Sequence, residues 1–149
     1  MDNNKPTATV HQLKPGDKPR RRVLIVEDDL DSVHSMAQLI RMMGHDVQFA
    51  INGFAAIDIA RTYRPDVIIL DIGLPDFKGD HLARQLRFEP GLENVRMIAI
   101  SGLPQENLEQ RALEAGCVEF YRKPIEPARL EELLEVSSPS EQSKPQSGV

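Results

Sequence analysis

Short apolar runs alternate with helix-like patterns along most of this 149-residue chain, and the alternation restricts the folds it can adopt. Between the runs, apolar residues recur at helical spacing, as at Leu30, Val33 and Ala37. Such alternation favours an α/β fold with a parallel sheet, helices on both faces and right-handed crossovers. The expected strands lie at residues 23–26, 47–51, 67–70, 97–100 and 118–121.

Glycine and proline residues punctuate this pattern where helices should begin or end. Gly44 and Gly116 are predicted to end the first and fourth helices, and Pro65 follows the second. Pro104 suits the first turn of the fourth helix. The run at 67–70, VIIL, is apolar on both faces, which is typical of a central strand.

The two ends of the chain differ in composition from its centre. Residues 1–20 are polar, and residues 137–149, SSPSEQSKPQSGV, are low in complexity. Such segments bury too little apolar surface to offset the entropy of ordering, so we expect flexible tails around one domain at 21–136. Three arginines at 20–22 form a basic cluster before the first strand. We expect a solvated lead-in there, with a docking arm for an acidic partner as the alternative.

Composition and charge exclude several classes of protein. A net charge of −5 argues against nucleic-acid binding, and no apolar run approaches the roughly 20 residues that span a bilayer. The N-terminus lacks the apolar stretch of a signal peptide, and the single cysteine, Cys117, fits a reducing compartment. We therefore expect a cytoplasmic protein without a membrane segment. The histidines show no metal-ligand spacing; they are His11, His34, His45 and His81.

Polar side chains follow four of the five expected strands. In an open parallel sheet, ligands bind where the carboxyl ends of the strands meet the loops. Each residue alone has a simpler explanation as a helix cap, a turn residue or a surface charge. Together they predict one site at one edge of the sheet. These residues are Glu27, Asp28, Asp71, Ser101 and Lys123.

The chemistry of this set indicates a site for a divalent cation and a phosphoryl group. Crowded carboxylates repel one another, and Mg²⁺ prefers oxygen ligands of this kind. Lys123 offers a positive charge for a phosphoryl oxygen, and Ser101 offers a hydrogen-bond donor. A carboxylate can also attack phosphorus and become an acyl phosphate.

Four motifs make the sequence resemble the receiver domain of two-component response regulators. They are VEDD after the first strand, LDIGLPDFKG after the third, ISG after the fourth and YRKPI after the fifth. The resemblance covers about residues 22–136. It implies a flavodoxin-like, doubly wound (βα)5 fold with strand order 2-1-3-4-5.

The resemblance also implies roles for the acidic residues. Asp71 is the expected phosphoacceptor and a metal ligand, and Asp28 is the expected direct ligand of Mg²⁺, for which Mn²⁺ can substitute. Glu27 would act through a metal-bound water, and the backbone carbonyl of Gly73 would complete the protein's share of the metal shell. Asp29 is the surplus acid and is expected to start a helix.

The remaining implied roles concern the response to phosphorylation. Ser101 would turn toward the phosphoryl group, and Lys123 would pair with that group. Phe120 would then swing into the space that Ser101 leaves. The Lys123–Pro124 peptide bond would be cis. Gly79 would provide the turn of the loop after the phosphoacceptor. Tyr121, next to Phe120, should point to the opposite face of the sheet.

The function implied is that of a single-domain response regulator, not an enzyme beyond its own phosphorylation and dephosphorylation. A histidine kinase or histidine phosphotransfer protein would phosphorylate it. The fourth helix, fifth strand and last helix would then bind a protein target or, through Arg111 or Arg129, a second copy. Chemotaxis-type switching, a phosphorelay step and a phosphate sink are all compatible with it. That face is acidic, which argues against DNA; its residues include Gln105, Glu106, Glu109, Gln110, Glu114, Glu131, Glu132 and Glu135.

Three other functions fit the sequence less well. A phosphohydrolase of the haloacid-dehalogenase type needs a second aspartate two positions after its nucleophile, where this chain has Gly73. A flavin or nucleotide binder needs a glycine-rich loop after the first strand, and none follows it here. A degenerate receiver would lack part of the phosphorylation chemistry, but every residue that this chemistry requires is present.

Overall fold

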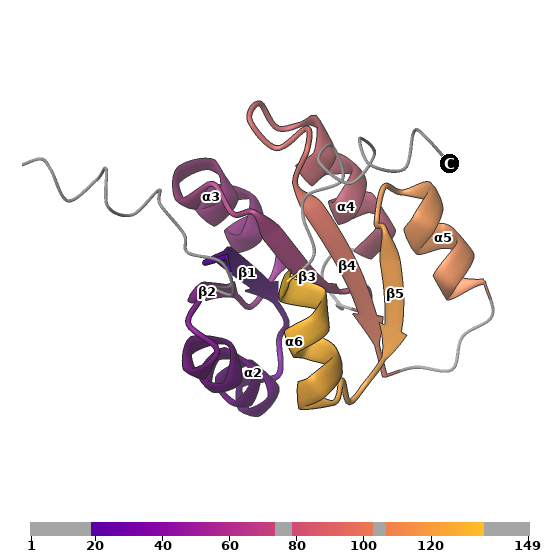
Figure 1. Cartoon of the computed structure of the whole chain (residues 1–149). Helices are drawn as coiled ribbons and strands as arrows, with labels where there is room; N and C mark the ends of the chain where they lie inside the picture. Colours follow the sequence, from indigo (N-terminus) through magenta and orange to yellow (C-terminus); the bar gives the residue numbers. More distant parts are fainter. Residues whose placement is uncertain (1–18, 74–78, 103–106, 136–149) are drawn as a thin grey trace, which may run out of the picture.

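The computed structural model describes residues 19–73, 79–102 and 107–135 (Figure 1). Strands and helices alternate along the whole described chain, as the sequence predicts. In chain order, the elements are β1 (Arg22–Val26), α2 (Leu30–Met42), β2 (Asp46–Ala50), α3 (Gly53–Tyr63), β3 (Val67–Asp71), α4 (Gly79–Phe88), β4 (Arg96–Ser101), α5 (Leu108–Glu114), β5 (Glu119–Arg122) and α6 (Pro127–Glu135).

The strands form one parallel sheet in the order β2-β1-β3-β4-β5, which confirms the expected flavodoxin-like topology. Strand β3 lies at the centre, and every residue of Val67–Asp71 is buried. Helices α2 and α6 cover one face of the sheet, and α3, α4 and α5 cover the other (Figure 1). All five strands therefore point their carboxyl ends toward the same edge.

Each face of the sheet has its own apolar cluster, because successive strand residues point to opposite sides. Ile68 packs in the cluster under α3, α4 and α5, whereas its neighbour Ile69 packs in the cluster under α2 and α6. The same alternation in β5 places Phe120 on the α5 side and Tyr121 on the α6 side. The expected opposite orientation of these two aromatic residues is confirmed.

Strand boundaries differ slightly from the expectation: the three inner strands extend by one residue at one or both ends, and the two edge strands are shifted by one residue. Strand β2 ends before Ile51, which is exposed, and β5 begins after Val118, which is also exposed. Leu30, which shares the helical spacing of Val33 and Ala37, is exposed, and it is the first residue of α2. The predicted position of Pro104 lies outside the described residues.

The basic residues at 20–22 contact the folded domain, although Arg20 and Arg22 remain exposed to solvent. Arg20 forms an ion pair with Asp46 at 2.7 Å. The guanidinium of Arg22 lies 4.9 Å from the centre of the Tyr63 ring, and that of Arg21 donates hydrogen bonds to carbonyls at the end of α6. The three side chains thus join β1 to β2, α3 and α6.

His45 links this cluster to the turn between α2 and β2. It is buried, and its Nδ1 accepts a hydrogen bond of 2.9 Å from the backbone N–H of Arg21. Burial, followed by the charges of Arg21 and Arg20, lowers the pKa of His45, against the smaller opposing effect of Asp46 and Glu135. The folded chain therefore favours the neutral imidazole.

The lowered pKa predicts that the fold loses stability in mild acid. Below about pH 6.5 the unfolded chain takes up a proton at His45 that the folded chain resists, so the free energy of unfolding falls as the pH falls. A single histidine contributes at most about 1.4 kcal/mol per pH unit. Urea unfolding at about pH 7.5 and about pH 5.5 gives the free energy of unfolding at each pH. Between the two, this free energy should fall less for His45→Gln than for wild type, because glutamine does not titrate. Equal losses would contradict this prediction.

Candidate functional site

Three carboxylates gather at the carboxyl edge of the sheet. Strands β1 and β3 are neighbours, with Val26 paired to Leu70, so Glu27 and Asp71 follow at the same level. Glu27, Asp28 and Asp71 each offer an oxygen atom, and these atoms lie within 4.8 Å of one another. Glu27 and Asp71 are buried, whereas Asp28 is exposed. The acids that the sequence singled out are therefore brought together.

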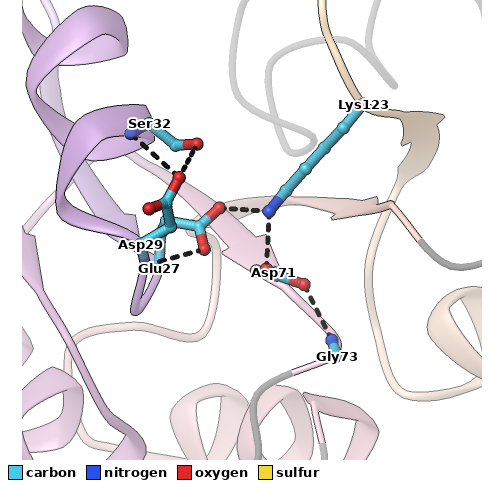
Figure 2. Close-up of polar contacts among 6 residues, drawn as sticks. All are labelled: Glu27, Asp29, Ser32, Asp71, Gly73 and Lys123. Carbon is cyan, nitrogen blue, oxygen red and sulfur yellow. Dashed lines mark hydrogen bonds and ion pairs between the residues drawn. The ribbon is translucent and has the colours of Figure 1, made fainter.

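Lys123 lies between the two buried acids (Figure 2). Its ammonium Nζ is 2.8 Å from Oδ2 of Asp71 and also contacts Oε1 of Glu27. The lysine follows β5 and its side chain reaches past the end of β4 to β3 and β1. The Lys123–Pro124 peptide bond is cis, as the resemblance implied.

Backbone N–H groups fix the other oxygens of the buried acids (Figure 2). The N–H of Asp29 donates to Oε2 of Glu27 at 3.2 Å, and the N–H of Gly73 donates to Oδ1 of Asp71 at 2.8 Å. The Asp29 side chain caps α2 by accepting from the N–H of Ser32, which confirms its expected role at the helix start. The acids are thus held in place by the loops after their strands.

The electrostatics of the site show an excess of buried negative charge. Burial raises the pKa of Glu27, although the hydrogen bond from Lys123 opposes this effect. Burial by itself would lower the pKa of Lys123, but its hydrogen bonds to Asp71 and Glu27 and their charges outweigh it, and the pKa is raised. One ammonium thus serves a cluster of three acids. The clustered donors are all carboxylate oxygens, and such a set fits a hard divalent cation such as Mg²⁺.

Ser101 ends β4 next to this cluster. It is fully buried, and its carbonyl accepts a hydrogen bond of 2.9 Å from the backbone N–H of Lys123. Its neighbour Ile100 pairs with Asp71 across the sheet, so Ser101 lies one residue beyond that pair. Gly79 is the first residue of α4, but the loop for which it was expected to provide a turn lies outside the described residues.

A cavity beside the site was not predicted from the sequence. It measures about 310 Å³ and lies between α2 and the segment that joins β5 to α6. Glu27 and Lys123 lie at one end, and apolar residues such as Met36 and Ile125 line the rest. Ser32 and Ser35 of α2 are among its polar lining residues.

Comparison with known proteins assigns the family. The family model described as "Response regulator receiver domain" matches residues 23–135, which is most of the chain. The chain belongs to this family. The receiver is 32% identical over 114 residues to the polar-differentiation response regulator DivK of Brucella anthropi, covering 76% of this chain and 93% of the relative. The DivK of Brucella ovis is 30% identical over the same coverage.

Solved structures of other receivers have the same fold. The receiver domain of the sensor histidine kinase PA1611 of Pseudomonas aeruginosa, with magnesium coordinated in its active-site cleft, has a TM-score of 0.70 and 26% identity. That match covers 78% of this chain and 95% of the other. The chemotaxis protein CheY4 of Vibrio cholerae, at 22% identity and a TM-score of 0.73, covers 78% and 97% and supports the fold.

Membership of the family settles the general function. The chain is a phosphoaccepting response regulator with an acidic site, rather than a conventional enzyme. A receiver of this family has a histidine kinase as its partner. Within the described part of the chain, no helix combines the length and the apolar character that crossing a bilayer requires.

Proposed function

We propose that Asp71 accepts a phosphoryl group from a histidine kinase or a histidine phosphotransfer protein in a Mg²⁺-dependent reaction. The observation that carries this proposal is the meeting of three carboxylates and one ammonium at a single edge of the sheet. Asp71 suits the acceptor role because it lies at the end of the central strand with Lys123 beside one oxygen.

The metal would be held by the acids that cluster here. Asp28 is proposed as the direct side-chain ligand beside Asp71, with Glu27 acting through a metal-bound water and the Gly73 carbonyl completing the shell. Mg²⁺, or Mn²⁺ in its place, supplies positive charge that offsets the repulsion between the acids and the incoming phosphoryl group. The magnesium in the PA1611 receiver supports this assignment.

The chain's own residues account for the rest of the transfer. An oxygen of Asp71 forms a bond to phosphorus as the bond between phosphorus and the donor histidine nitrogen breaks, and the electron pair stays with the imidazole. Lys123, which now pairs with Oδ2 of Asp71, neutralises charge on the transferred group. The hydroxyl of Ser101 donates a hydrogen bond to it.

The phosphoryl group would alter the surface formed by α5, β5 and α6. It adds close to two negative charges, toward which Ser101 moves, and Phe120 follows into the vacated space. The surface is acidic, so a protein with a basic groove, or a second copy that uses Arg111 or Arg129, is a better partner than DNA. Glu131 is half-buried, and Gln105 and Glu106 lie outside the described residues; the exposed members are Glu109, Gln110, Glu114, Glu132 and Glu135.

We further propose that the folded receiver domain spans residues 21–136 and acts in the cytoplasm. The free thiol of Cys117 is buried and its pKa is raised to about 12 by burial, so it is a packed side chain rather than a reactive one.

Labelling with acetyl phosphate tests the proposed function. Intact-mass measurement should show one phosphoryl group per chain with Mg²⁺ and none with excess EDTA, because the acids repel the donor when no cation is bound. The same protein should not hydrolyse phosphomonoesters with multiple turnovers, as a phosphohydrolase would. Metal-independent labelling or steady turnover would contradict the proposal.

A further inference from the structure

Helix α6 is tied to the sheet by a buried arginine. Arg96, the first residue of β4, is almost completely buried. Its guanidinium donates to the carbonyl of Leu133, in the last turn of α6, and forms an ion pair with Glu119 at the start of β5. One side chain therefore joins two strands to the end of this helix.

Tyr121 extends the same network along β5. Its hydroxyl donates to Oε2 of Glu119 at 3.0 Å, while Oε1 of Glu119 takes the bond from Arg96. The guanidinium of Arg129 lies 5.9 Å from the centre of the Tyr121 ring, on the side of α6. A cation placed against an aromatic ring in this way is attracted to it.

A second arginine, which lies directly before β1, also holds the end of α6. Arg21, directly before β1, donates to the carbonyl of Leu134 at 3.0 Å. The last carbonyls of a helix have no partner inside the helix. Three of them, at Leu133, Leu134 and Glu135, accept hydrogen bonds here from Arg96 on β4 and from Arg21 directly before β1. Moving α6 would therefore leave polar groups without partners. We call these contacts of Arg21, Arg96, Glu119, Tyr121 and Arg129 the α6 clamp.

Helix α5, on the opposite face beside β5, is held differently. It has seven residues, and Asn107 before it has a left-handed backbone with φ of 68° and makes no capping hydrogen bond through its side chain. A groove of about 680 Å³ lies along α5 and β5, with Leu113 and Phe120 among its lining residues. The groove leaves open space beside α5 and the Phe120 ring.

We infer that phosphorylation alters only the α5 side of the α5–β5–α6 surface, because the α6 clamp holds the other side in one position. This inference rests on the proposed function, since it needs the site at Asp71 to respond. Phe120 belongs to the α5 side and Tyr121 to the clamp, so neighbouring residues of one strand separate the responsive half from the fixed half. Partners that bind α6 alone would then not distinguish the two states.

Amide hydrogen exchange with and without Mg²⁺ and beryllofluoride, a non-covalent mimic of a phosphoryl group, tests the inference on the wild-type chain. Exchange should change in peptides from α5 and stay the same in peptides from α6. A change in α6 as large as that in α5 would overturn the inference. No change anywhere, including the loops around Asp71, would instead contradict the proposed function, so the two failures are distinguishable.

Removing the clamp should release α6. In Arg96→Met, the mimic should change exchange in α6 as well as in α5, whereas Arg61→Met, which removes an exposed ion pair with Glu89, should behave as wild type. If Arg96→Met fails to fold, Tyr121→Phe can be used in its place, because it removes only the hydrogen bond to Glu119. In that variant the mimic should change hydrogen exchange in α6 to a smaller extent. An unchanged α6 in both variants would show that the clamp does not restrain the helix.

Discussion

Replacing Asp71 by asparagine is expected to abolish phosphoryl acceptance while preserving the fold. Asparagine has nearly the same shape, and its amide oxygen can still accept the 2.8 Å bond from the backbone N–H of Gly73. It has no anionic oxygen to attack phosphorus, so no acyl phosphate forms. After incubation with acetyl phosphate and Mg²⁺, intact-mass measurement should find phosphorylated wild-type chain and only unmodified variant.

Asp31→Asn is the matched control for this substitution. Asp31 is exposed and lies in the first turn of α2. Its replacement by asparagine removes one negative charge near the site, as Asp71→Asn does. This variant should be labelled as fully as wild type. Retained labelling of Asp71→Asn would show that another residue accepts the phosphoryl group.

Replacing Lys123 by methionine is expected to destabilise the metal-free fold by about 3 kcal/mol. Breaking a buried ion pair by removing one partner costs about 3–5 kcal/mol, and the lower end applies because Lys123 keeps part of its surface in water. The substitution leaves Glu27 and Asp71 buried, close together and without a counter-charge. Urea unfolding in EDTA should show the loss.

Added Mg²⁺ should reduce the difference in the free energy of unfolding between wild type and Lys123→Met. The dication supplies the positive charge that the ammonium provided, so it should stabilise the variant more than wild type. Lys123→Arg keeps the positive charge, so its free energy of unfolding in EDTA should be close to that of wild type. A Lys123→Met protein as stable as wild type without metal would mean that the lysine does not balance the buried acids.

The fold followed from the sequence because its strongest signals are local. A fully apolar run at the centre of the sheet and helical spacing between the runs need no knowledge of distant contacts. The strand boundaries were less well predicted, because pairing continues beyond the apolar runs. Strand β4, for example, extends by one residue at each end, where Arg96 pairs with Val67 and Ser101 with Arg122.

The site was predicted as a set of residues, but its internal contacts were not. The ends of the strands specify which side chains meet. The contact of Lys123 with Glu27 depends on distances between side-chain atoms, which the spacing of residues along the sequence does not give. The α6 clamp was missed for the same reason. Its one signal was Arg96, a charged residue at the start of an apolar strand, whose partners come from elements more than twenty residues away in the chain.

A crystal structure of the chain with Mg²⁺ and beryllofluoride tests the central claim most directly. We expect the metal among Glu27, Asp28 and Asp71, the beryllofluoride on the Asp71 carboxylate, and Lys123 in contact with the fluoride atoms. Metal or beryllofluoride bound elsewhere, with Lys123 still bridging Glu27 and Asp71, would contradict it.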